Sequence, residues 1–221
     1  MLEARGYSAR FVACLMVGLC ACADAVSDAS NADAEEPRGA SSRRKPARDA
    51  NIEAVTGDIA VVSGLDSVVP NESEDDSAVL IFQEQHALTL RSPLGLDLFA
   101  PGKSPEPSAL AGDIQAGVTV NVYFVHFDPV GKASKHFAAS IVFPDPILGV
   151  AYRMKTLDAG DAIVGRDDVE YPKPRSASER GLEYPGADKL TFEADGRTLA
   201  IDLSTSTSSD QLRVVTHAAA D

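Results

Sequence analysis

The stretch Val118-Thr-Val-Asn-Val-Tyr-Phe-Val-His-Phe127 decides the fold that we expect for this chain. Its β-branched and aromatic residues recur at a period of two, which is typical of a β-strand. One side of that strand would carry Val118, Val120, Val122 and Phe124, and the other side Tyr123, Val125 and Phe127. Because both sides are apolar, the stretch predicts a central strand that is covered on both faces.

Other short runs along the chain are also rich in β-branched and aromatic residues at a period of two. They are residues 59–62, 78–83, 87–91, 137–143, 189–194, 198–203 and 212–216. Strands of this kind without a sustained helical period predict an all-β domain in which two antiparallel sheets pack together, a β-sandwich or jelly roll. Residues 157–165 predict one short helical turn, and no other segment has a helical pattern.

The pair Asp195-Gly196 predicts a hairpin, since both residues tolerate a positive φ in a two-residue turn. With Ala194 opposite Arg197, the register sets Phe192 opposite Leu199 and Leu190 opposite Ile201. These apolar pairs would then share one face, so register and burial agree.

The N-terminus predicts export. Arg5 and Arg10 precede a charge-free run that extends from Phe11 to Cys22, which is the pattern of a secretory signal and too short for a membrane-spanning helix. The stretch Leu19-Cys-Ala-Cys22 resembles the lipobox of bacterial lipoproteins, in which the last cysteine is acylated and becomes the mature N-terminus. Ordinary cleavage at Ala21-Cys-Ala23 is the alternative, and it would give a freely secreted product.

We therefore divide the chain into a signal peptide (1–21), a disordered tether (22–51), a β-sandwich domain (52–217) and a short tail (218–221). The tether is rich in Ala, Ser, Asp, Glu and Arg and has too little apolar surface to fold. The three cysteines are Cys14, Cys20 and Cys22, so the domain has no thiol for a disulfide, a zinc cluster or a nucleophile.

The net charge of −13 disfavours nucleic acid as a partner and is compatible with divalent cations. Carboxylates gather in turn-rich sequence at residues 72–76 and at four further aspartates. A structural calcium site is one hypothesis, with Asp158, Asp161, Asp167 and Asp168 as its candidate ligands. The alternative is that these acids cap turns and keep the surface soluble.

The histidines favour no catalytic or metal site. His86, His126, His136 and His217 lack the H-x-H and H-E-x-x-H spacings that bring two imidazoles to one metal. His126 and Asp128 end the long strand, where Asp128, Pro129 and Gly131 are better interpreted as a turn. A hydrolase would need a site without the G-x-S-x-G elbow, which is absent from the sequence.

Carbohydrate binding usually needs exposed aromatic rings, and the chain has no Trp. Tyr152, Tyr171 and Tyr184 fall in predicted loops, where they could display a ring or pack against a sheet edge.

Several segments together resemble a group of uncharacterised secreted bacterial proteins, some of which end in a PEP-CTERM-type sorting signal. The segments are Phe82-Gln-Glu-Gln-His86, Tyr123-Phe-Val-His-Phe-Asp-Pro-Val-Gly131, Ile147-Leu-Gly149, Leu157-Asp-Ala-Gly-Asp-Ala162, Arg180-Gly-Leu-Glu183 and Asp210-Gln-Leu-Arg-Val-Val-Thr216. The likeness runs from about residue 74 to residue 216. It implies an exported β-sandwich and assigns no catalytic residue.

The sequence thus predicts a non-enzymatic lipoprotein, anchored to the cell envelope through the lipid on Cys22, whose β-sandwich contacts an envelope or extracellular polymer or protein in adhesion or matrix association. The runner-up hypothesis is a polysaccharide-binding module, with or without calcium. A secreted hydrolase with an unrecognised site comes third.

Overall fold

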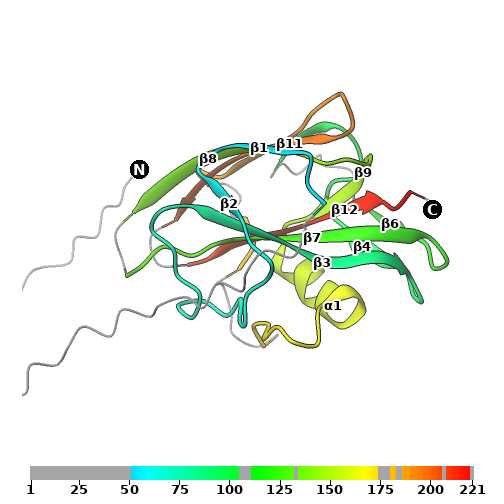
Figure 1. Ribbon diagram of the computed structural model, residues 1–221, viewed down its shortest axis with the longest axis horizontal. Coiled ribbons are helices and arrows are strands. Elements are labelled where there is room, and N and C mark those ends of the chain that lie inside the picture. Colours follow the sequence, from blue (N-terminus) through cyan, green and yellow to red (C-terminus); the bar gives the residue numbers. More distant parts are fainter. Residues whose placement is uncertain are drawn as a thin grey trace, which may run out of the picture. The chain divides into compact units, whose positions relative to one another are not determined.

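Two five-stranded sheets pack face to face in the computed structural model (Figure 1), which describes residues 51–104, 111–131, 134–173, 180–182, 186–205 and 208–219. Sheet A has the order β1 (Ala54–Gly57), β8 (Lys135–Val142), β11 (Thr198–Thr205), β10 (Lys189–Phe192) and β5 (Gly102–Ser104). Sheet B has the order β2 (Ile59–Val61), β3 (Val79–Thr89), β7 (Thr119–Phe127), β12 (Asp210–His217) and β9 (Ile147–Ala151). The prediction of an all-β sandwich is confirmed.

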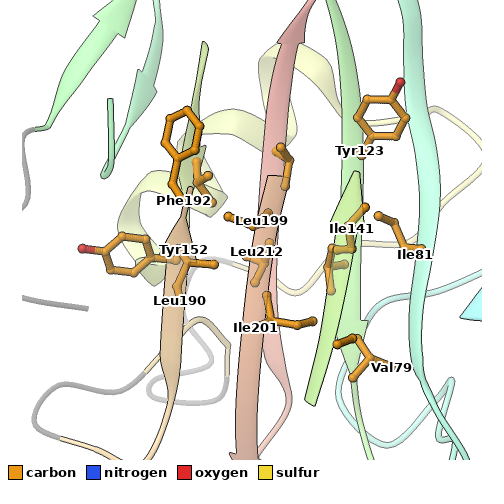
Figure 2. Close-up of a cluster of buried hydrophobic side chains, with 14 of the residues drawn as sticks. Val79, Ile81, Tyr123, Ile141, Tyr152, Leu190, Phe192, Leu199, Ile201 and Leu212 are labelled. Carbon is orange, nitrogen blue, oxygen red and sulfur yellow. The ribbon is translucent and has the colours of Figure 1, made fainter. Parts of the chain in front are cut away.

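The central position of residues 118–127 is also confirmed. Strand β7 lies in the middle of sheet B, between β3 and β12. Its odd-numbered apolar side chains enter the core between the two sheets, and its even-numbered ones enter a second core on the outer face of sheet B. Figure 2 shows the first of these cores, where Tyr123 and Ile81 of sheet B lie across from Ile141 and Leu199 of sheet A.

The hairpin of β10 and β11 has the predicted register, with Phe192 opposite Leu199 and Leu190 opposite Ile201. Its turn is different from the two-residue turn that we expected. The Gly196 N–H donates to the Glu193 carbonyl at 3.1 Å, and the Glu193 N–H donates to the Thr198 carbonyl at 2.9 Å. The loop is therefore longer, and Gly196 supplies the positive φ of 74° that it needs.

Three expectations about single elements need correction. Residues 78–83 and 87–91 were predicted as two strands, and the structure has the single strand β3, whose register against β7 shifts twice between Gln83 and Leu88. Strands β2 and β3 pair in parallel, so sheet B is mixed rather than purely antiparallel. The predicted helical turn at 157–165 is a longer helix, α1 (Met154–Val164).

A small two-stranded sheet and the helix cover the outer face of sheet B. The small sheet pairs β4 (Leu94–Leu96) with β6 (Gly112–Ile114). The second core lies under these elements, with Leu94 and Leu96 from β4, Leu157 and Val164 from α1, and Phe124 from sheet B. Across the described ranges, no helix has the length and apolar character needed to cross a membrane.

Candidate functional site

Helix α1 is held at both ends by side chains that are distant in the sequence. At its start, both the Tyr152 and Arg153 N–H groups donate to the Asp97 carboxylate at 2.8 Å, and the Thr156 hydroxyl donates to the same carboxylate at 2.8 Å. At its end, the Gln85 amide donates to the Val164 and Gly165 carbonyls at 3.1 and 3.2 Å. These contacts satisfy backbone groups that a helix cannot satisfy internally. The Asp97 charge also suits the positive end of the helix dipole.

Beneath the helix lies a cluster of charged side chains, the candidate functional site, centred on Arg213 of β12. Arg213 is fully buried, on the face of β12 that is covered by α1. Its guanidinium binds Glu84 of β3 in a fork, with Nε–Oε2 at 2.6 Å and Nη2–Oε1 at 2.9 Å. It also donates to Asp161 at 2.8 Å and to the Leu157 carbonyl at 3.2 Å, so β12 is tied to both β3 and α1.

A second arginine, Arg180, extends the cluster. Its Nη1 lies 2.6 Å from Asp161 and 3.0 Å from Asp158, and its Nε donates to Gln211 at 2.8 Å. The Cζ atoms of Arg180 and Arg213 lie 5.9 and 5.2 Å from the centre of the Phe124 ring. The Phe124 ring and the carboxylates thus both stabilise the two guanidinium groups. Without these partners, their burial would cost considerable free energy.

Tyr171 closes the cluster on the Glu84 side. Its hydroxyl donates to Glu84 at 2.6 Å and accepts from the Arg166 N–H at 3.0 Å. Burial and the neighbouring Glu84 charge raise the pKa of Tyr171 above its ordinary value, so the phenol stays protonated. Burial alone would lower the pKa of Arg213, but the charges and hydrogen bonds of Glu84 and Asp161 outweigh it and raise that pKa.

Close packing of α1 on the cluster requires a glycine at position 160. A Cβ atom added to Gly160 would lie 2.4 Å from Nη1 of Arg213, a distance that no side chain tolerates. Glycine is otherwise unfavourable inside a helix. Its presence there allows the helix backbone to reach the guanidinium.

His126 and Asp128 lie at the edge of the same cluster. Because Gln211 accepts from Arg180 with its oxygen, its amide nitrogen faces Nδ1 of His126 at 3.2 Å and must donate to it. The neutral ring therefore carries its proton on Nε2, which lies 3.8 Å from Asp128. Burial, together with the Arg180 charge, lowers the pKa of His126 to about 3, while burial, followed by the Glu74 charge, raises the pKa of Asp128 to about 6.

Asp128 has a wider role than the turn that its sequence context predicted. Its carboxylate accepts the N–H of Asn71 at 2.7 Å, and its carbonyl accepts the N–H of Asp75 at 2.8 Å. In return, Asp76 and Glu74 accept the N–H groups of residues 130 and 131 at 3.1 Å each. The acidic segment at residues 72–76 is thus fastened to the turn after β7.

The calcium hypothesis can now be compared with the positions of its four aspartates. Asp158 and Asp161 face Arg180 and Arg213, Asp168 forms an ion pair with Arg166 at 2.7 Å, and Asp167 is exposed. Guanidinium groups therefore occupy carboxylate oxygens that a cation would need. Over the ranges listed above, no three His, Cys, Asp or Glu side chains come close enough together to hold a metal ion.

The other residues singled out in the sequence are dispersed. His136 forms a pair with Asp202 on the outer face of sheet A, opposite Ser204, and His86 and His217 are exposed. The Tyr152 ring lies in the core between the sheets (Figure 2), and Tyr171 packs edge-to-face on Phe124 at 6.0 Å, so neither ring is displayed. Cys22, the signal segment and Tyr184 lie outside the described residues.

Sequence reasoning missed Glu84, Arg180 and Arg213, the residues that build the cluster. One signal was available for Arg213, because it lies between the apolar residues Leu212 and Val214, and the period of β12 sets it on the same face as Val215. An arginine at such a position is buried only with a partner. Nothing local identifies that partner, since Glu84 is 129 residues away in the chain.

Comparisons with protein-family models, with curated proteins and with solved structures give no match to this chain. The resemblance to secreted bacterial proteins therefore stays an expectation from the sequence.

Proposed function

We propose that this protein is a non-enzymatic β-sandwich of the cell envelope, held there by a lipid on Cys22, that contacts other envelope or extracellular components in adhesion or matrix association. The lipid and the export follow from the form of the N-terminal sequence. The proposed role of the domain rests on its closed charged cluster and on the outer face of sheet A.

The observation that carries this proposal is the closure of the charged cluster. Arg213 and Glu84 are buried and Arg180 is nearly so. Arg213 binds Glu84, and both arginines bind Asp161. Groups in such an arrangement fix α1 on sheet B, and Arg213 and Glu84 at its centre are shielded from a substrate. This supports a structural role for the most concentrated chemistry in the described domain.

The outer face of sheet A supports an interaction role. One row crosses all five strands in register, and it consists of Thr56, Ser140, Ala200, Thr191 and Lys103. Four of these five side chains are short, so the row forms a flat face with Lys103 at one edge. A flat face with hydroxyl groups and a cation suits contact with an extended polymer or another protein surface.

The anchor is tested by fractionation of cells that produce the full chain or its C22A variant. We expect the wild type in the membrane fraction and C22A in the soluble exported fraction. Membrane retention of C22A would contradict the lipoprotein proposal. Release of both the wild type and C22A would favour ordinary signal cleavage.

The interaction role is tested with Ala200→Arg, at the centre of the flat face, and with Ala159→Arg, on the exposed side of α1, as the matched control. Binding of the purified proteins to isolated envelope fragments should fall at least tenfold for A200R and stay unchanged for A159R. Equal binding of both variants would exclude this face. Turnover of a chromogenic ester or glycoside would instead favour the hydrolase hypothesis, and retention of a neutral glycan would favour the polysaccharide-binding module.

A further inference from the structure

A groove lies between the end of β3 and the last turn of α1. It is lined by Leu88, Thr89, Arg91, Ser92, Ala162 and Ile163, and its volume is about 330 Å³. That volume is at the small end of the range for ligand sites, roughly 300–1,000 Å³. The groove could thus hold a ligand of modest size.

The groove combines an apolar floor with one cation. Leu88, Ala162 and Ile163 provide aliphatic surface, and Thr89 and Ser92 provide hydroxyl groups. None of these six described lining residues is acidic, although the chain as a whole carries a net charge of −13. Among the described residues of the lining, the guanidinium of Arg91 is the one charged group.

Arg91 differs from the other arginines in the described part of the chain. Arg153, Arg166, Arg180, Arg197 and Arg213 each form an ion pair with an Asp or Glu side chain. Arg91 is exposed and has no such partner among the described residues. The other described arginines bind carboxylates of the domain itself. The Arg91 guanidinium is therefore available to bind an anionic ligand.

Part of the adjacent end of α1 is already occupied. The carbonyls of Val164 and Gly165 accept the Gln85 amide. The Thr89 hydroxyl is bonded to that of Thr119 at 3.0 Å, on the strand side of the groove.

We propose that this groove binds an anionic amphiphile, with a short alkyl chain on Leu88, Ala162 and Ile163 and a carboxylate or phosphate on Arg91. A guanidinium presents parallel N–H donors that match the oxygens of either anion. The alkyl chain gains from leaving water in proportion to the apolar area it buries. The site is separate from the charged cluster and from the flat face of sheet A, so it goes beyond the proposed function and does not depend on it.

The test is calorimetric titration of the purified soluble C22A protein, which carries no lipid, in detergent-free buffer with four probes. Octanoate and octyl phosphate carry both features, inorganic phosphate lacks the chain, and octyl glucoside lacks the charge. We expect one-to-one binding of at least one of the two amphiphilic anions, with the other two probes at least tenfold weaker. Preference for octanoate would indicate a fatty acid, and preference for octyl phosphate a lipid phosphate.

Two variants and one control complete the test. R91Q should weaken binding of the amphiphilic anion at least tenfold, and I163S should weaken it severalfold, while K155Q, which removes an exposed cation elsewhere on α1, should leave it unchanged. Since Arg91 is exposed, R91Q should also keep the wild-type unfolding midpoint. No binding of any probe at millimolar concentration, equal binding of octyl glucoside, or unchanged binding by R91Q would each overturn the proposal.

Discussion

Arg213 shows how one residue can govern the packing of a whole face. Its guanidinium is fully buried and meets Glu84 from β3 and both Asp161 and a backbone carbonyl from α1. Burying such a group costs free energy unless each of its donors is satisfied. The arrangement therefore favours one position of the helix over nearby alternatives.

Replacement of Arg213 by Met should destabilise the domain by about 3–5 kcal/mol, because Glu84 would remain buried without its partner. Urea unfolding would measure the loss. The double variant R213M/E84M removes both charges and should recover a large part of it. A double variant as unstable as the sum of the single variants would show that the two side chains do not act as a pair.

His126 and Asp128 should have opposite effects on stability as the pH changes. Folding lowers the pKa of His126 from 6.5 to about 3, so its stabilising effect is present above pH 6.5 and is lost as the pH falls toward 3. Folding raises the pKa of Asp128 from 3.8 to about 6, so its stabilising effect is present below pH 3.8 and is lost as the pH rises through 6. Between about pH 4 and 6 the two effects nearly cancel.

The variant D128N should reveal how the stability of the domain depends on the protonation of His126, an effect that Asp128 offsets in the wild type. Relative to wild type, we expect D128N to lose about 2–3 kcal/mol of unfolding free energy between pH 6.5 and pH 4, measured by urea unfolding at each pH. The exposed D167N variant is the control and should follow the wild type. A constant difference between D128N and wild type across that range would contradict the assigned pKa shifts.

At the scale of elements, Gly160 makes the packing of α1 on sheet B testable. The variant G160A gains helix propensity of about 1 kcal/mol but sets a methyl group against the Arg213 guanidinium. We expect a net destabilisation of about 1–3 kcal/mol, because the helix or the guanidinium must shift. Urea unfolding and the helical circular-dichroism signal would report it.

The control for this prediction is Ala159→Gly, at the neighbouring exposed position of α1. It changes propensity in the opposite sense and touches no part of the cluster, so its cost should not exceed about 1 kcal/mol. If G160A were more stable than the wild type, the close approach of the helix to Arg213 would be wrong.

Elements with a continuous pattern could be predicted from the sequence, and those that depend on distant residues could not. The alternation in β7 and in the β10–β11 hairpin identified their faces and register correctly. Strand β3 looked like two strands because the polar residues Glu84, Gln85 and His86 interrupt its apolar pattern. The structure keeps one strand there by shifting its register, and a bond from the Ala87 N–H to Asn121 holds the Ala87 φ at 49°. The length of helix α1 was underestimated because its capping groups, Asp97 and Gln85, come from other parts of the chain.

At the scale of the whole domain, the sandwich was predictable and the order of its strands was not. The alternation along a strand shows which of its faces are buried. It does not show which strands pair, and the parallel pairing of β2 with β3 depends on contacts between distant parts of the chain. The charged cluster depends in the same way on β3, β12 and α1 meeting at one place.

The melting temperature of the protein should be the same in EDTA and in millimolar calcium. Asp158 and Asp161 are held by Arg180 and Arg213, so a cation would have to displace guanidinium groups to bind there. Differential scanning calorimetry provides the measurement. A rise of several degrees with calcium would show that the folded state binds the ion and would support the calcium hypothesis instead.

The way the chain enters the domain has a mechanical consequence. The segment from Ala54 to Val61 contributes β1 to sheet A and then β2 to sheet B, and just before it the Asn51 carbonyl accepts the Tyr123 hydroxyl at 2.7 Å. A pulling force applied upstream of Asn51 therefore reaches both layers of the sandwich through one short segment. The rupture load of the domain should be set by the pairing of β1 with β8 and of β2 with β3, and not by the strength of its core.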